Sequence, residues 1–223
     1  MNNIKRFVIM MVIYLFLSCF GQSILFSLGI GDDLLRMFII DLLFMITAIY
    51  MYKTEIKKDL KKLKKQKFSV VIKSIIKWLV IIFVFCAIIN IVTYIIFPEL
   101  ESTTDGNNAA IEVLFNKSKL YVIFKTLIYA AIAEDILYKL SLRTIINNKF
   151  LFIVTSALLY TILNYIFIDY NAYNYVLVYA IFCRFIPEIS FVSAYVKNND
   201  NIIISMVIKI IYNLIPLLIL FLV

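Results

Sequence analysis

Apolar runs of about 20 residues recur along the whole chain, and they constrain the fold more than any other feature. A run of this length can cross the hydrocarbon core of a bilayer as a helix, because a helix bonds every backbone group within its own segment. Apolar residues make up 64% of the 223 residues, against about 45–50% in an ordinary soluble domain. The sequence therefore predicts an all-α, multi-pass transmembrane helical bundle.

About seven helices are expected from where these runs begin and end. The predicted spans cover residues 7–28, 34–52, 69–97, 119–140, 150–168, 173–196 and 202–222. The first run follows a basic start but is too long for a secretion signal, so we expect an uncleaved span. We divide the chain into N-terminal transmembrane helices, residues 1–118, and a second membrane domain, residues 119–223.

Most of the positive charge lies in one segment between two apolar runs. Residues 53–67 contain eight lysines and two acids, and so carry six of the eight net positive charges of the chain. We expect a cytoplasmic loop here, lying against an anionic lipid surface, and no nucleic-acid partner. Alternation then places the amino terminus, the turn at 139–149 and Lys197 in the cytoplasm. The acidic connection 98–118 and the carboxyl terminus are expected outside.

Charged and amide side chains inside the spans are few. A charge at the centre of a bilayer costs at least about 2.5–3.5 kcal/mol, so each needs a partner or a function. These residues are Asp41, Glu134, Asp135, Lys139, Asn164, Arg184, Glu188, Lys209 and Asn213.

The fourth span contains two adjacent carboxylates and a lysine. Asp135 precedes Lys139 by four positions, the favourable order for an ion pair within one helix. Neighbouring positions of an α-helix point about 100° apart, so we expect that Glu134 and Asp135 do not both face one point. Two interpretations stay open: an ion-pair cluster that locks helix packing, and a buried carboxylate that acts as a general base.

Two further pairs are spaced four apart. Ser205 and Lys209 could form a nucleophile with its base, although a serine in a membrane helix more often bonds its own backbone. Arg184 and Glu188 flank Pro187, which is expected to kink the sixth span; this polar kink could satisfy freed backbone groups or line a substrate path.

The chain contains no histidine. This excludes an imidazole general base and every zinc site that needs an imidazole ligand. We therefore expect no metal cofactor.

Glu134-Asp135-x-x-x-Lys139 resembles a conservative variant of the EExxxR signature of the CPBP family, the CAAX protease and bacteriocin-processing (Abi) intramembrane endopeptidases. The resemblance covers roughly residues 119–215, under half of the chain. It implies a membrane protein of the bacterial cell envelope in which Glu134 would activate water, while Asp135 and Lys139 would be the structural acid and cation.

Two later motifs also match the family in order and spacing. Tyr160-x-x-x-Asn164 stands where the family has FxxxH, and Lys209-x-x-x-Asn213 where it has HxxxN. The resemblance implies that Asn213 is the oxyanion donor, but Asn164 and Lys209 replace both histidines. An amide does not exchange a proton at neutral pH, and an ammonium has no acceptor. We therefore predict that Lys209 instead neutralises Glu134.

Our leading interpretation is a protease-inactive member of this family that binds a membrane or secreted partner, in bacteriocin immunity or cell-envelope regulation as the resemblance implies. An active endopeptidase that uses Glu134 is the alternative. A small transporter is the third, because charges inside the spans could line a path, although no inverted repeat is visible.

Overall fold

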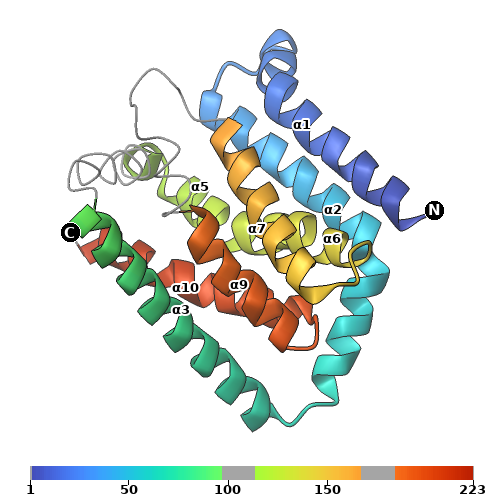
Figure 1. The fold of residues 1–223 in the computed structure, drawn as a ribbon. Helices are drawn as coiled ribbons and strands as arrows, with labels where there is room; N and C mark the ends of the chain where they lie inside the picture. Colours follow the sequence, from blue (N-terminus) through green and yellow to red (C-terminus); the bar gives the residue numbers. More distant parts are fainter. Residues whose placement is uncertain (1, 97–113, 167–183, 223) are drawn as a thin grey trace.

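A computed structural model describes residues 2–96, 114–166 and 184–222, and every regular element in these ranges is helical (Figure 1). The elements are α1 (Asn3–Ser27), α2 (Asp33–Lys64), α3 (Phe68–Ile96), α5 (Lys119–Ile123), η2 (Phe124–Glu134), η3 (Ile136–Leu140), α6 (Ser141–Arg143), α7 (Lys149–Ile166), α9 (Ile186–Lys197) and α10 (Ile202–Leu222). Within the described ranges, α1, α2, α3 and α10 are long and apolar enough to cross a bilayer. The predicted all-α membrane bundle is confirmed.

Helices α1 and α2 form an antiparallel pair. Gly29 follows α1 with φ +89, a left-handed conformation that glycine adopts without strain. Asp32 then caps α2 by accepting a hydrogen bond of 2.9 Å from the Leu35 amide. A Cβ added at Gly21 would lie 2.9 Å from the Ile40 side chain, so the absent side chain lets the two helices approach closely.

The prediction of a loop at residues 53–67 is wrong for most of that segment. Helix α2 continues to Lys64, with one non-helical residue, Tyr52 (φ −113, ψ 17), where the predicted span ends. Lysine, leucine and glutamate all favour helix, and the apolar residues of this segment follow a helical spacing that gives it an inner face. The connection to α3 is therefore only the short stretch at residues 65–67.

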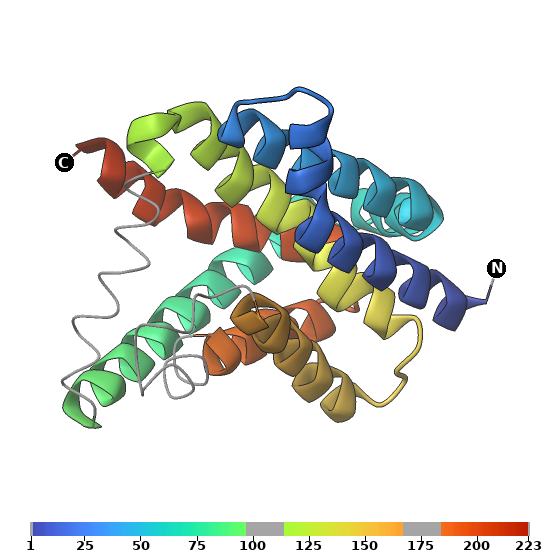
Figure 2. The same cartoon turned by 90° about the horizontal axis from the view of Figure 1, so that it is seen from above.

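A continuous helix, residues 119–143, runs through the middle of the bundle, between the pair α1 and α2 and the pair α7 and α9 (Figure 2). Most of it, η2 and η3, has π-helical turns, which close with i→i+5 hydrogen bonds. Its Ile136 packs in one core with Met10 and Phe44 from the first 118 residues and with Val192 from α9. Residues of both predicted domains thus share this core.

Polar contacts gather at one end of the bundle. Asn3 donates to the Thr144 carbonyl (3.1 Å), and Asn201 donates to the Asp59 carbonyl (3.1 Å). The start of α1, the lysine-rich half of α2 and the turns at 144–148 and 198–201 therefore meet here. At the opposite end the rings of Phe115 and Phe221 touch, with centroids 4.8 Å apart. This arrangement agrees with the alternation expected from the sequence.

Two predicted segments fall partly outside the described residues. These are the acidic connection 98–118, described only from residue 114, and the sixth span 173–196, described only from residue 184. Within the described part, Pro187 lies in the first turn of α9.

Candidate functional site

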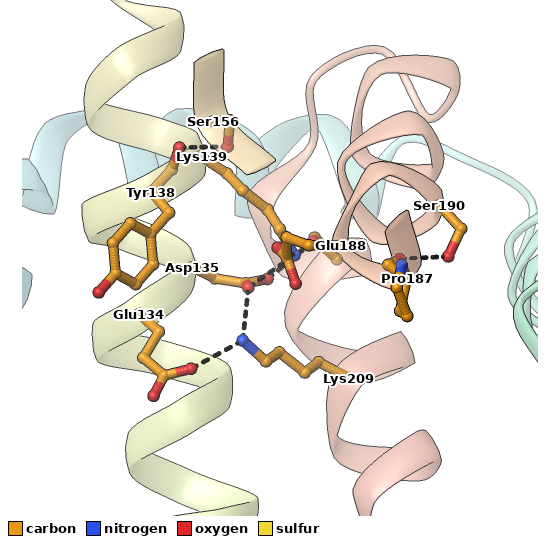
Figure 3. Close-up of polar contacts among 10 residues, drawn as sticks. Glu134, Asp135, Tyr138, Lys139, Ser156, Pro187, Glu188, Ser190 and Lys209 are labelled. Atoms are coloured by element: carbon orange, nitrogen blue, oxygen red, sulfur yellow. Dashed lines mark hydrogen bonds and ion pairs between the residues drawn. The ribbon is translucent and has the colours of Figure 1, made fainter. Parts of the chain in front are cut away.

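The residues of the predicted first motif meet α10 in the interior of the bundle (Figure 3). Glu134 and Asp135 lie where η2 passes into η3, and Lys209 reaches them from α10. The Lys209 ammonium lies 2.9 Å from the Glu134 carboxylate and 3.6 Å from the Asp135 carboxylate. The predicted pairing of Lys209 with Glu134 is confirmed.

The expectation that Glu134 and Asp135 could not face one point is wrong, because Lys209 contacts both. A turn closed by i→i+5 bonds holds more residues than an α-turn, so successive side chains diverge by less than in an α-helix. The long lysine stem also lets one ammonium reach both acids.

Asp135 is the most connected member of the cluster. Its side chain has no exposed surface, and it accepts hydrogen bonds from Lys139 (2.7 Å) and from the Ser205 hydroxyl (2.7 Å). The ion pair predicted between Asp135 and Lys139 is thereby confirmed. Lys139 also donates to the Ser205 oxygen at 3.2 Å, so three side chains from two helices form a closed ring of hydrogen bonds.

Ser205 belongs to this ring and does not form the pair with Lys209 that their spacing allows. Its hydroxyl proton goes to Asp135, and the nearest ammonium that donates to it is Lys139. The lysine four positions along α10 is turned to the two carboxylates instead. A serine nucleophile with Lys209 as its base is therefore not the arrangement in the structure.

Glu188 of α9 closes the cluster from a third side. Its carboxylate lies 3.8 Å from the Lys139 ammonium, and its Oε1 atom is buried without a hydrogen-bond partner among the described residues. Three acids therefore face two lysines in this cluster, and Arg184 lines the cavity beside Glu134 and Lys209.

The two asparagines of the later motifs line the same cavity as Glu134, but neither forms a hydrogen bond with the Glu134 carboxylate. The Asn164 amide donates to the Tyr160 carbonyl (2.8 Å) of its own helix, and the Asn213 amide donates to the Thr126 carbonyl (2.8 Å) across from α10. The cavity has a volume of about 610 Å³ and extends from Glu134 to an apolar end at Pro216 and Leu220.

A second polar cluster was not predicted as such. Asp41 of α2 accepts hydrogen bonds from Lys125 (2.8 and 2.9 Å) and from the Tyr121 hydroxyl (3.0 Å). The sequence analysis identified Asp41 as a charge inside a span that needs a partner. Its partner Lys125 lies 84 positions away, and no local spacing links the two residues. A cavity of about 340 Å³ at this cluster shares Lys125, Glu134 and Asn164 with the larger cavity.

A metal site does not fit the residues present around Glu134 and Asp135. The Lys209 ammonium occupies a position between Glu134 and Asp135 that a cation would need, and it cannot be a ligand while protonated. In the described ranges no three His, Cys, Asp or Glu side chains are grouped to hold a metal ion.

Comparison with known proteins finds no matching protein-family model, no matching curated protein and no matching solved structure.

Proposed function

We propose that this chain is a protease-inactive, CPBP-like membrane protein that acts by binding a membrane or secreted partner, in bacteriocin immunity or cell-envelope regulation. The single observation that carries the proposal is the contact of 2.9 Å between Lys209 and Glu134, at the positions that match the family's histidine and its catalytic glutamate. The family assignment itself is part of the proposal and depends on the motif residues alone.

A hydrolytic role for Glu134 would need a carboxylate that is free to take a proton from water. Lys209 instead holds this carboxylate by a charge-assisted hydrogen bond of 2.9 Å. The chain also has no histidine to pass the proton on, and positioned proton transfer contributes about 10²–10⁴-fold to a rate. These features favour a structural cluster over a catalytic one.

The large cavity beside the cluster supports the binding role. One end is polar, with Lys209, Asn164 and Asn213, and the other is apolar, with Pro216 and Leu220. A membrane-embedded peptide segment that carries a few polar groups has this same mixed character. We place its binding site between α10 and the helix at residues 119–143.

The membrane orientation is proposed from charge. The start of α1, the lysine-rich half of α2 and the turns at 144–148 and 198–201 lie at one end of the bundle. Basic residues favour the cytoplasmic side, so we assign this end, with the amino terminus, to the cytoplasm of a bacterial cell.

Photo-crosslinking in cells tests the binding site. A photoreactive residue at Ile219, which lines the cavity, is expected to form a discrete protein adduct, while one at Ile91, on the exposed face of α3, is not. The two positions are similarly exposed, 57% and 59%, so equal labelling from both would contradict the proposal.

A cleavage assay separates binding from the endopeptidase alternative. Purified protein in liposomes is incubated with membrane peptides, including one with a CAAX-type terminus, beside the Glu134→Ala variant. We expect no cleavage by either. Cleavage by the natural protein but not by the Glu134→Ala variant would contradict the proposal and support the endopeptidase alternative.

The transporter alternative is favoured by one observation, the two cavities that share Lys125, Glu134 and Asn164. Flux of amino acids, peptides or ions into liposomes that contain the purified protein tests it. A flux that Glu134→Gln abolishes would support transport in place of partner binding.

A further inference from the structure

The lysine-rich half of α2 is held in a fixed direction after a bend. At Tyr52 the helix turns away from its first half and runs down the edge of the bundle to α3 (Figure 1). Arg6 of α1 stabilises the bend, since its guanidinium lies 4.2 Å from the centre of the Tyr52 ring and donates two hydrogen bonds to Glu55 (2.6 and 3.0 Å). The direction of this segment is therefore set by contacts with α1.

The inner face of the same segment is docked on the bundle. Ile56 and Leu63 pack against the apolar core. Between them Asp59 is buried, and its carboxylate accepts a hydrogen bond of 3.1 Å from the Ile202 amide at the start of α10. Because this face is occupied, the opposite face points away from the protein.

That opposite face is a stripe of lysines. Lys53, Lys57, Lys61 and Lys65 are spaced four apart and form one row, while Lys58 and Lys62 lie on the adjacent row. The two rows border a hollow of about 500 Å³. At 1.5 Å per residue, the stripe extends for about 18 Å.

Little negative charge balances this stripe within the protein. Lys62 lies 2.9 Å from Asp59, but the structure gives no ion pair to the other five lysines within the described residues. Like charges four apart on a helix repel one another. An anion seated among these ammonium groups would relieve that repulsion.

We propose that these six lysines form a binding site for the phosphate groups of anionic phospholipids. Each ammonium offers three hydrogen-bond donors to phosphate oxygens. The stripe starts one residue after the apolar part of α2 ends at Tyr52, which places its first lysines at the depth of the headgroups. Its length exceeds what one phosphate can contact, so we infer that it binds the headgroups of the surrounding membrane.

The test uses the full chain in a neutral detergent at about 0.15 M salt, where charges more than about 8 Å apart are screened. Phosphatidylglycerol is titrated in, and bound lipid is counted by native mass spectrometry. Replacing Lys57, Lys58 and Lys61 by glutamine is expected to weaken binding by about 100-fold, or about fivefold per lysine. Unchanged thermal unfolding of this variant shows that its inner face stays docked.

The matched control removes three exposed lysines outside the hollow, Lys5, Lys73 and Lys77, also by glutamine. It changes the net charge equally and is expected to weaken binding by threefold or less. Equal weakening in the two triple variants would overturn the proposal, since total charge would then explain the binding. Equal binding of phosphatidylcholine would also overturn it.

Two further binding measurements distinguish lipid phosphate from free phosphate and from nucleic-acid phosphate. Inorganic phosphate at millimolar concentration is expected not to displace the lipid, and a short oligonucleotide is expected to bind more weakly than phosphatidylglycerol. Displacement by free phosphate, or tighter binding of the oligonucleotide, would refute a lipid site.

Discussion

Asp135→Asn is expected to destabilise the folded protein by about 3–5 kcal/mol, the usual cost of removing one partner from a buried ion pair. Asp135 has no exposed surface, it accepts hydrogen bonds from Lys139 and Ser205, both at 2.7 Å, and it lies 3.6 Å from the Lys209 ammonium. The asparagine has nearly the same volume, so the change removes charge without opening a cavity. Two lysines would then remain inside the bundle with one acid fewer.

Glu188→Gln is the matched control. Glu188 is also buried and also lies near Lys139, but at 3.8 Å, and its Oε1 atom has no hydrogen-bond partner among the described residues. Removing its charge breaks no hydrogen bond of the ring formed by Asp135, Lys139 and Ser205. We expect a cost of about 1 kcal/mol or less, the size of one ordinary hydrogen bond.

Both variants are unfolded by sodium dodecyl sulfate in detergent micelles, with the fluorescence of Trp78, the single tryptophan, as the signal. Trp78 packs near Ile208 of α10, in the helix that also carries Lys209. If Glu188→Gln costs as much as Asp135→Asn, the hydrogen-bonded ring does not hold the cluster together, and our account of it is wrong.

Two further predictions concern contacts away from the cluster. Lys125→Met is expected to cost more stability than Asp41→Asn, about 3 against about 1 kcal/mol, because Asp41 is buried and would be left unpaired, whereas the Lys125 side chain is 40% exposed and can turn away. Equal costs in the same unfolding assay would contradict this. Asp59→Ala removes the acceptor of the Ile202 amide and is expected to speed amide hydrogen exchange at the start of α10 severalfold, as loss of a helix cap does. Mass spectrometry measures the exchange, and unchanged rates there would show that the lysine-rich half of α2 does not anchor α10.

The helices themselves could be predicted well from hydropathy. The last predicted span, 202–222, coincides with α10, and the third, 69–97, begins one residue after the start of α3. Apolar runs of this length leave the backbone no alternative to a helix in lipid. The lysine-rich segment was missed because its charge was taken as a sign of a loop, although its helix-forming residues and its apolar spacing indicate a helix.

Contacts in the candidate site between residues close in the sequence could be predicted, whereas most contacts between distant residues could not. The pair Asp135 and Lys139 follows from a local rule for helices and was predicted. The placement of Lys209 beside Glu134 was inferred from the motif order. The hydrogen bond from Ser205 to Asp135 and the ion pair from Lys125 to Asp41 depend on how distant helices pack, and no local spacing encodes them.

The side-chain directions in the fourth span were mispredicted for a different reason. An α-helical geometry was assumed for Glu134 and Asp135, whereas η2 and η3 are π-helical. The sequence carries no simple pattern for π-helical turns, which are rare and occur often at functional sites. The convergence of both acids on one ammonium could therefore be found only in the structure.

The central claim is that Lys209 neutralises Glu134, and a double-mutant cycle measures this most directly. Unfolding free energies are compared for Glu134→Gln, Lys209→Met and the double variant. Since the two groups are 2.9 Å apart and largely buried, we predict a coupling energy of about 1–3 kcal/mol, so that the double variant is more stable than the sum of the single effects implies. Additive effects, within about 0.5 kcal/mol, would contradict the claim.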